Sequence, residues 1–155
     1  MPSKAALRPS KPSPNPVRDA ADALYRTAKE CCHQHERLKT LNRVHADDAE
    51  FNATWDVAET CEAQLAARTE SYEKTAELGR GKETEEWWHT ANTLWHACRE
   101  YTRRHAASNG AASRTRRHGA EELKEISLEY ELELSARMAV KQALEKYGVL
   151  RPDAA

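Results

Sequence analysis

The chain has 155 residues, of which 32% are charged and 39% are hydrophobic, and its formal net charge is −1. A net charge near zero excludes the global field that draws nucleic acids or anionic membranes to strongly basic proteins. No apolar run approaches the roughly 20 residues that span a bilayer, and the N-terminus lacks the apolar segment of a secretory signal, so we expect a cytoplasmic protein without membrane contact.

Residues 1–14 are rich in Pro, Ser and Lys and contain no acid, which is typical of a disordered basic tail. Five of the six prolines lie within the first 16 residues, so almost no helix breakers follow. Asn15 and Pro16 form a helix start, because Asn caps helices and Pro favours their first position. We therefore expect an all-helical domain over residues 15–150.

Helical spacing of apolar residues predicts four helices, at about 16–45, 48–78, 83–107 and 120–147. Asp47 and Glu50 form a variant of the capping box that opens the second helix. The Asn109-Gly110 pair predicts a loop before the fourth helix, which should end at Gly148. Short connections make successive helices antiparallel neighbours, so the predicted fold class is all-α, an antiparallel up-down-up-down four-helix bundle.

The segment 126–134 alternates between apolar and polar side chains, a pattern that also favours a β-strand. A single strand would have no partner in this chain and its spacers are mostly glutamates, so a helix is the preferred interpretation. In that helix Leu128, Leu132 and Ala139 form a second apolar seam, opposite Tyr130. Because exposed apolar patches are disfavoured, the seam predicts an interface in a homodimer or with a helical protein partner.

The middle layer of the predicted bundle combines thiols, an imidazole and a carboxylate: Cys31, His35, Cys61, Glu62 and Cys98. These are ligand types for zinc and similar metals, so a metal- or thiol-based bundle is one alternative. The preferred interpretation is that the cysteines, which follow no disulfide or Cys-x-x-Cys spacing, are reduced and fill core space. Glu62 would then hydrogen-bond to His35 or to the hydroxyl of Tyr130, and no cofactor is expected.

Residue counting across the third loop sets the register of the last two helices. It places Cys98 opposite Glu129 and Tyr130. The same arithmetic groups Leu38, Trp55, His105 and Leu123 in another layer.

Two strings, Glu30-x-x-His33 and Glu86-x-x-His89, resemble the metal-binding strings of ferritin-like di-iron bundles. At 100° per residue both histidines point away from the apolar stripes, and the register separates the strings by on the order of 15 Å. Metals in a shared site lie about 3.5–4 Å apart, so no di-iron site is expected.

The spacing Arg99-x5-His105 resembles the Arg-x(4–6)-His motif of HEPN ribonucleases, which are small α-helical bundles. The resemblance implies RNA cleavage with Arg99 and His105 as the catalytic pair. The chain departs from the family at Glu100, where a polar residue often follows the arginine. The spacing of Arg26 and His33 fits the motif as well.

Charge is segregated along the chain, with nine acids against two bases in residues 47–77 and six arginines against Glu100 in residues 99–118. The basic segment could contact phosphates through a set of arginines: Arg103, Arg104, Arg114, Arg116 and Arg117. These cations could equally offset the dipole at a helix C-terminus or pair with nearby glutamates.

No Gly-rich phosphate loop, nucleophile elbow or Ser/His/Asp set is visible in the sequence. We therefore expect a non-enzymatic helical module for protein–protein interaction or scaffolding. The alternatives are a metal- or thiol-based bundle and a HEPN-like ribonuclease or nucleic-acid-binding bundle.

Overall fold

The computed structural model describes residues 16–44, 47–78, 86–114 and 120–151. These residues form four helices: α2 (Pro16–Arg43), α3 (Asp48–Leu78), α4 (Glu86–Arg114) and α5 (Ala120–Leu150). The all-α bundle is confirmed, and the alternating segment 126–134 is helical as preferred. The tail predicted over residues 1–14 lies outside this part of the chain. None of the helices, over their described residues, is long and apolar enough to cross a membrane.

The starts of the first two helices follow from local sequence. α2 begins at Pro16, as predicted. α3 begins at Asp48, where the Ala49 amide donates a 2.8 Å hydrogen bond to Oδ1 of Asp47. That bond satisfies one of the amides left unpaired at a helix N-terminus, so Asp47 acts as the cap.

Two predicted helix ends were wrong. α4 continues through Asn109-Gly110 to Arg114, beyond the predicted end at about residue 107. A glycine inside a helix costs only about 1 kcal/mol, which the remaining contacts of a long helix can offset. α5 continues past Gly148 to Leu150. A Cβ at Gly148 would lie 3.0 Å from the hydroxyl oxygen of Tyr25, so this glycine makes room for Tyr25 rather than ending the helix.

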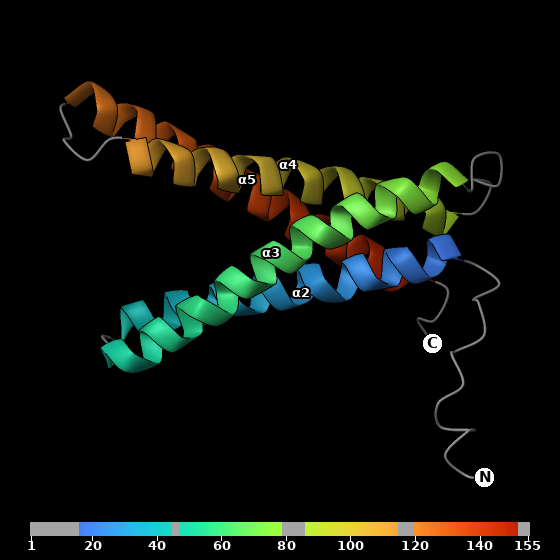
Figure 1. The fold of residues 1–155 in the computed structure, drawn as a ribbon. Helices are drawn as coiled ribbons and strands as arrows, with labels where there is room; N and C mark the ends of the chain where they lie inside the picture. Colours follow the sequence, from blue (N-terminus) through green and yellow to red (C-terminus); the bar gives the residue numbers. More distant parts are fainter. Residues whose placement is uncertain (1–15, 45–46, 79–85, 115–119, 152–155) are drawn as a thin grey trace, which may run out of the picture.

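The four helices form two antiparallel hairpins, α2–α3 and α4–α5, which converge at one end and separate at the other (Figure 1). We call these the closed end and the open end. At the open end, the first arm comprises residues 35–42 and 51–62, and the second arm comprises residues 101–108 and 127–142. The molecule is therefore a bundle that is complete over only part of its length.

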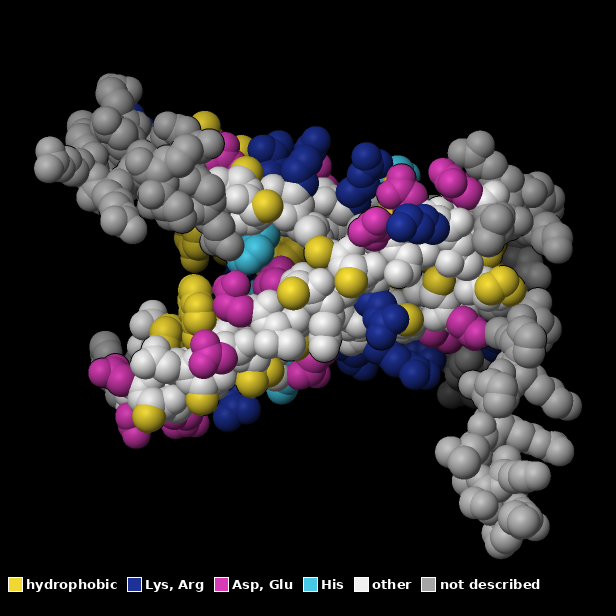
Figure 2. All heavy atoms as spheres, viewed as in Figure 1, with side chains coloured by type: hydrophobic (Ala, Val, Ile, Leu, Met, Phe, Trp, Pro, Cys, Tyr) yellow, Lys and Arg dark blue, Asp and Glu magenta, His cyan; other side chains and the backbone are white. Residues whose placement is uncertain are grey.

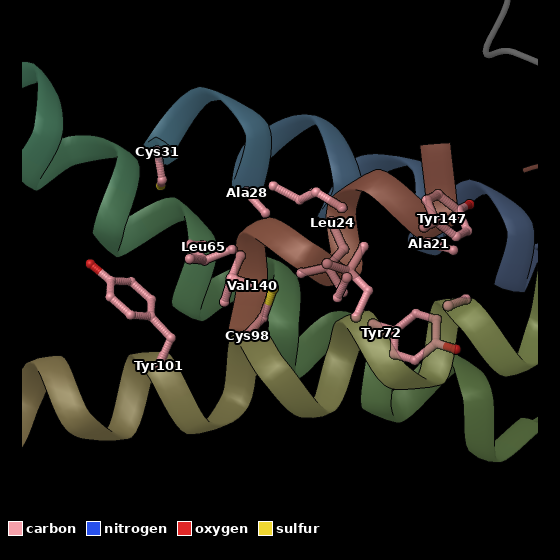
Figure 3. Close-up of a cluster of buried hydrophobic side chains, with 14 of the residues drawn as sticks. Ala21, Leu24, Ala28, Cys31, Leu65, Tyr72, Cys98, Tyr101, Val140 and Tyr147 are labelled. Atoms are coloured by element: carbon pink, nitrogen blue, oxygen red, sulfur yellow. The ribbon is translucent and has the colours of Figure 1, made fainter. Parts of the chain in front are cut away.

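The closed end holds the main hydrophobic core (Figure 3). Leu24, Leu94 and Tyr147 are fully buried there. The hydroxyl of Tyr147 donates a 3.0 Å hydrogen bond to Asp22, and that of Tyr72 donates a 2.6 Å bond to Asn92. Each buried hydroxyl thus has its own acceptor, which removes the penalty of burying it.

The predicted register of α4 against α5 was wrong by about ten residues. Cys98 lies beside Val140 rather than beside Glu129 and Tyr130 (Figure 3), and His105 meets Glu133. The count failed because α4 extends to Arg114, which moves the turn toward the C-terminus.

The predicted layer of Leu38, Trp55 and His105 is not a packed layer. All three side chains line one cleft at the open end. The side chain of Leu123, its fourth predicted member, lies outside those that the structure describes.

Candidate functional site

A cleft of about 1010 Å³ lies between the two arms. Figure 2 shows it at the open end, with hydrophobic side chains on both edges and a histidine and acidic groups deeper in. Its apolar walls comprise Leu38, Phe51, Trp55 and Ala58 on the first arm and Tyr130, Leu134 and Met138 on the second. Each wall therefore presents apolar side chains, and charged side chains such as Lys39, Glu59 and Lys141 also line the cleft.

Phe51 and Trp55 form a flat aromatic surface on the first wall. They stand one helical turn apart on α3, and their rings stack with centroids 6.3 Å apart and planes at 29°. Trp55 is nevertheless 50% exposed. A half-exposed, ring-stacked tryptophan has little rotamer freedom to lose, which makes it a favourable anchor for a partner.

The floor of the cleft begins with a buried polar cluster from α2, α3 and α4. His35 Nε2 lies 2.6 Å from Oε1 of Glu62, and the hydroxyl of Tyr101 donates a hydrogen bond to the same oxygen. Burial, together with the nearby Glu62 carboxylate, raises the pKa of Tyr101 far above its usual value, so the phenol stays protonated and remains a donor. Through this cluster a carboxylate of the first arm is bound to α4 of the second.

A second cluster continues the floor on the other arm. His105 Nδ1 lies 2.7 Å from Oε1 of Glu133, and Arg137 approaches the same oxygen at 3.6 Å. The hydrogen bond that His105 makes to the Glu133 carboxylate raises the pKa of His105 despite the opposing effect of burial. Burial opposes ionisation of Glu133, but its bond to His105 and the charge of Arg137 outweigh that effect and lower its pKa. Both shifts therefore favour the imidazolium–carboxylate form of the pair.

Ring contacts join the two clusters into one floor. The rings of Tyr101 and His105 stack with centroids 5.9 Å apart, and the guanidinium of Arg137 lies 5.9 Å from the Tyr101 ring centroid. His35 packs edge-on against the other side of the network, also 5.9 Å from Tyr101. The two carboxylates of the floor are thus engaged by neighbouring side chains, whereas His35 Nδ1 and Arg137 Nε are buried without a hydrogen-bond partner.

The predicted thiol layer exists, but as core packing. Cys31, Cys61 and Cys98 are all buried, and burial is the largest cause that raises the pKa of each. They are thus neutral thiols. Within the described ranges, no three His, Cys, Asp or Glu side chains are arranged to hold a metal ion. Glu62 binds His35 as predicted, whereas the tyrosine that joins it is Tyr101 and not Tyr130.

The structure does not bring the ribonuclease-like pair together. Arg99 is exposed and its guanidinium lies 5.4 Å from the ring centroid of Trp95, while His105 lies in the cleft floor against Glu133. Six residues of helix separate them by about 120° around the axis. The arrangement lacks the shared catalytic surface that the resemblance implies.

Two of the arginines predicted to contact phosphates form ion pairs within the chain. Arg103 and Arg104 both bind Glu100, at 2.5 and 2.9 Å. The side chain of Arg114 and the whole of Arg116 and Arg117 lie outside what the structure describes.

The residues of the predicted apolar seam lie on the outer side of the second arm. Leu128 is 56% exposed, Leu132 is half-buried and Ala139 is exposed. No partner chain is present, so the seam remains a prediction.

Sequence reasoning missed Glu133 and Arg137 as floor residues. The signal was available, because Glu133 stands at helical spacing from the buried residues Ala136 and Val140. A charged residue on a buried stripe indicates a paired charge. What the sequence could not supply was the identity of its partner, since the register of α4 against α5 was misplaced.

No protein-family model, curated protein or solved structure matches this chain.

Proposed function

We propose that this protein is a non-enzymatic interaction module that binds a helix of a partner protein in the cleft between its two hairpins. The observation that carries the proposal is the pair of apolar walls, which expose Trp55, Tyr130 and Met138 to solvent. Unpartnered apolar surface of this kind is typical of protein-binding grooves. Helices also recognise such grooves through an apolar face.

The size of the cleft supports a helical ligand. Two turns of α-helix, about 10 Å wide and 11 Å long, occupy on the order of 900 Å³. The cleft volume of about 1010 Å³ is of the same order. The cleft is also bounded by helices on both sides, so an inserted helix would restore the layering of a complete bundle.

The floor supports binding rather than catalysis. Both buried carboxylates, Glu62 and Glu133, already accept hydrogen bonds from neighbouring side chains. A polar floor below apolar walls gives a partner one preferred depth and orientation, because a misplaced apolar group would disrupt paired charges.

Trp55 provides the test. Synthetic helical peptides with a leucine stripe, one series acidic and one basic on the polar face, should shift the Trp55 emission to shorter wavelength in a saturable manner. Met138→Glu places a charge on the opposite wall and should weaken binding at least about tenfold. Its matched control is Val149→Glu, a still more exposed position of α5 at the closed end, which should leave the affinity unchanged.

The Trp55→Phe variant identifies the source of the signal, because the chain has three further tryptophans. Absence of a shift with every peptide, or equal affinity of the Met138→Glu and Val149→Glu variants, would contradict binding in the cleft.

A further inference from the structure

A smaller hollow of about 240 Å³ lies between the C-terminal end of α3 and the N-terminal end of α4. It is at the closed end of the molecule and, among the residues that the structure describes, shares no lining residue with the cleft. Pockets for drug-sized ligands have volumes of about 300–1,000 Å³, so this hollow has room for a head group or one side chain. Three aromatic side chains line it, Tyr72, Trp88 and Trp95, and we call it the aromatic pocket.

The rings of the aromatic pocket are held in place by contacts within the chain. The hydroxyl of Tyr72 donates a 2.6 Å hydrogen bond to Oδ1 of Asn92. Nε1 of Trp95 donates a 3.1 Å hydrogen bond to the backbone oxygen of Thr69. The centroids of the Tyr72 and Trp95 rings lie 6.3 Å apart, and Trp88 is only 4% exposed. A ligand would therefore meet rings that lose little freedom when it binds.

The aromatic pocket carries negative charge at its edge. Its described lining includes two exposed carboxylates, Glu73 and Glu77, which stand one turn apart on α3, and no Lys or Arg. Lys74, the nearest cation in sequence, binds Glu70 instead, at 3.1 Å. Among the described lining residues, only His96 can become a cation. Aromatic rings and nearby carboxylates are the two features that attract an organic cation.

The ring of Trp95 already attracts one cation from outside the pocket. The guanidinium of Arg99 lies 5.4 Å from the ring centroid, within the distance of about 6 Å at which such attraction acts. Arg99 stands one turn after Trp95, in the direction away from Trp88, and does not line the pocket. This contact therefore shows the affinity of the ring for positive charge without placing that charge in the pocket.

The hydrogen-bonding groups of the pocket favour a cation that has no N–H group. Oδ1 of Asn92 already accepts the hydroxyl of Tyr72, and Nε1 of Trp88 is a donor that is buried without a hydrogen-bond partner. The head group of a lysine or arginine would leave N–H donors unpaired beside these groups, which costs free energy. A quaternary ammonium has no donor to satisfy, and aromatic rings bind such groups. An oxygen acceptor near the ammonium would also suit the donor of Trp88.

We propose that the aromatic pocket binds a small quaternary ammonium compound that carries a hydroxyl or carbonyl oxygen. The ammonium lies among the rings of Tyr72, Trp88 and Trp95, and Glu73 and Glu77 supply the opposite charge at the edge. This site is separate from the cleft, so it does not depend on the binding of a partner helix.

The test compares choline with neohexyl alcohol, which has the same shape and hydroxyl but a carbon atom in place of the charged nitrogen. Each compound is titrated into the isotope-labelled full chain, and binding is followed by the NMR signals of the tryptophan indole N–H groups. We expect saturable shifts with choline, with a dissociation constant in roughly the millimolar range. Neohexyl alcohol should bind at least about fivefold more weakly, because only choline is attracted by the rings and carboxylates as a cation.

Substitutions in the lining locate the bound cation. Replacing both edge carboxylates, by Glu73→Gln with Glu77→Gln, should weaken choline binding at least about threefold and leave the binding of neohexyl alcohol unchanged. Both positions are exposed, so this variant should fold. Glu70→Gln, an exposed position of α3 that does not line the pocket, is the matched control. Trp95→Leu keeps an apolar side chain without the ring and should weaken choline binding at least about fivefold.

Several outcomes would overturn the proposal. One is the absence of a saturable shift with choline up to about 50 mM. Equal affinity for neohexyl alcohol would show that the hollow does not select a cation, and tighter binding of n-butylammonium would show that it does not select a quaternary one. Choline binding that is unchanged in the double glutamine variant and in Trp95→Leu would place the ligand elsewhere. If Trp95→Leu does not fold, as circular dichroism checks, the double glutamine variant decides.

Discussion

The closed and open ends of the molecule are built from the same four helices but use their side chains differently. At the closed end, Leu24, Leu94 and Tyr147 are withdrawn from water and each buried hydroxyl has one acceptor. At the open end, the hairpins meet over a floor of paired charges that includes Glu62 and Glu133. Both carboxylates are buried and paired, so the polar floor lies where the closed bundle gives way to the cleft.

The largest expected difference between the two ends concerns stability. Leu94→Ala should lower the free energy of unfolding by about 2–5 kcal/mol, because a fully buried leucine leaves a cavity when truncated. Met138→Ala, at a position 63% exposed in the cleft wall, should change it by less than about 0.5 kcal/mol in the monomer. Urea denaturation at low protein concentration measures both. Equal losses would mean that the cleft wall is part of the core.

A smaller effect is expected at the floor. Glu62→Gln replaces a carboxylate that accepts bonds from His35 and Tyr101, and hydrogen bonds to charged groups contribute about 1–3 kcal/mol. We expect a loss of stability in that range. Glu59→Gln, at an exposed position three residues earlier on α3 that also lines the cleft, is the control and should have an effect within about 0.5 kcal/mol. If the two substitutions were equivalent, the floor would not hold the hairpins together.

The smallest effect is a pH dependence confined to the open end. The raised pKa of His105 contributes stability that is complete below its unfolded value of 6.5 and is lost as the pH rises through the higher folded value. The lowered pKa of Glu133 contributes stability that is present above 4.5 and is lost as the pH falls through the lower folded value. The pair therefore stabilises the fold most between pH 4.5 and 6.5.

His105→Gln removes the imidazole titration but keeps a hydrogen-bond donor. The stability difference between the unmodified chain and this variant should be larger at pH 5.5 than at pH 8.5, as measured by urea denaturation. The other histidines titrate in both proteins and cancel in the difference. An equal difference at both pH values would show that the bond between His105 and Glu133 carries no net charge effect.

Part of the floor could be predicted from sequence, because a short connection between two helices fixes which of their residues lie opposite each other. His35 and Glu62 lie on helices joined by a tight turn, so residue counting from that turn placed them together correctly. Tyr101 and Glu133 belong to helices whose connection was misjudged, because Asn109-Gly110 resembles a turn and is helical. When the position of a turn is wrong by a few residues, the pairing of residues across the two antiparallel helices is wrong by twice that number. For this reason Tyr130, and not Tyr101, was assigned to Glu62.

The sequence by itself determined that this chain is helical, where its first two helices begin, and that the last helix has two apolar sides. Those properties follow from the spacing of side chains along one helix and from capping residues, which act locally. Only the tertiary structure decided that the hairpins separate, that Gly148 admits Tyr25, and that paired charges form the floor of a cleft. These features depend on which side chains meet across helices distant in sequence, and local spacing does not specify the angle at which two hairpins cross.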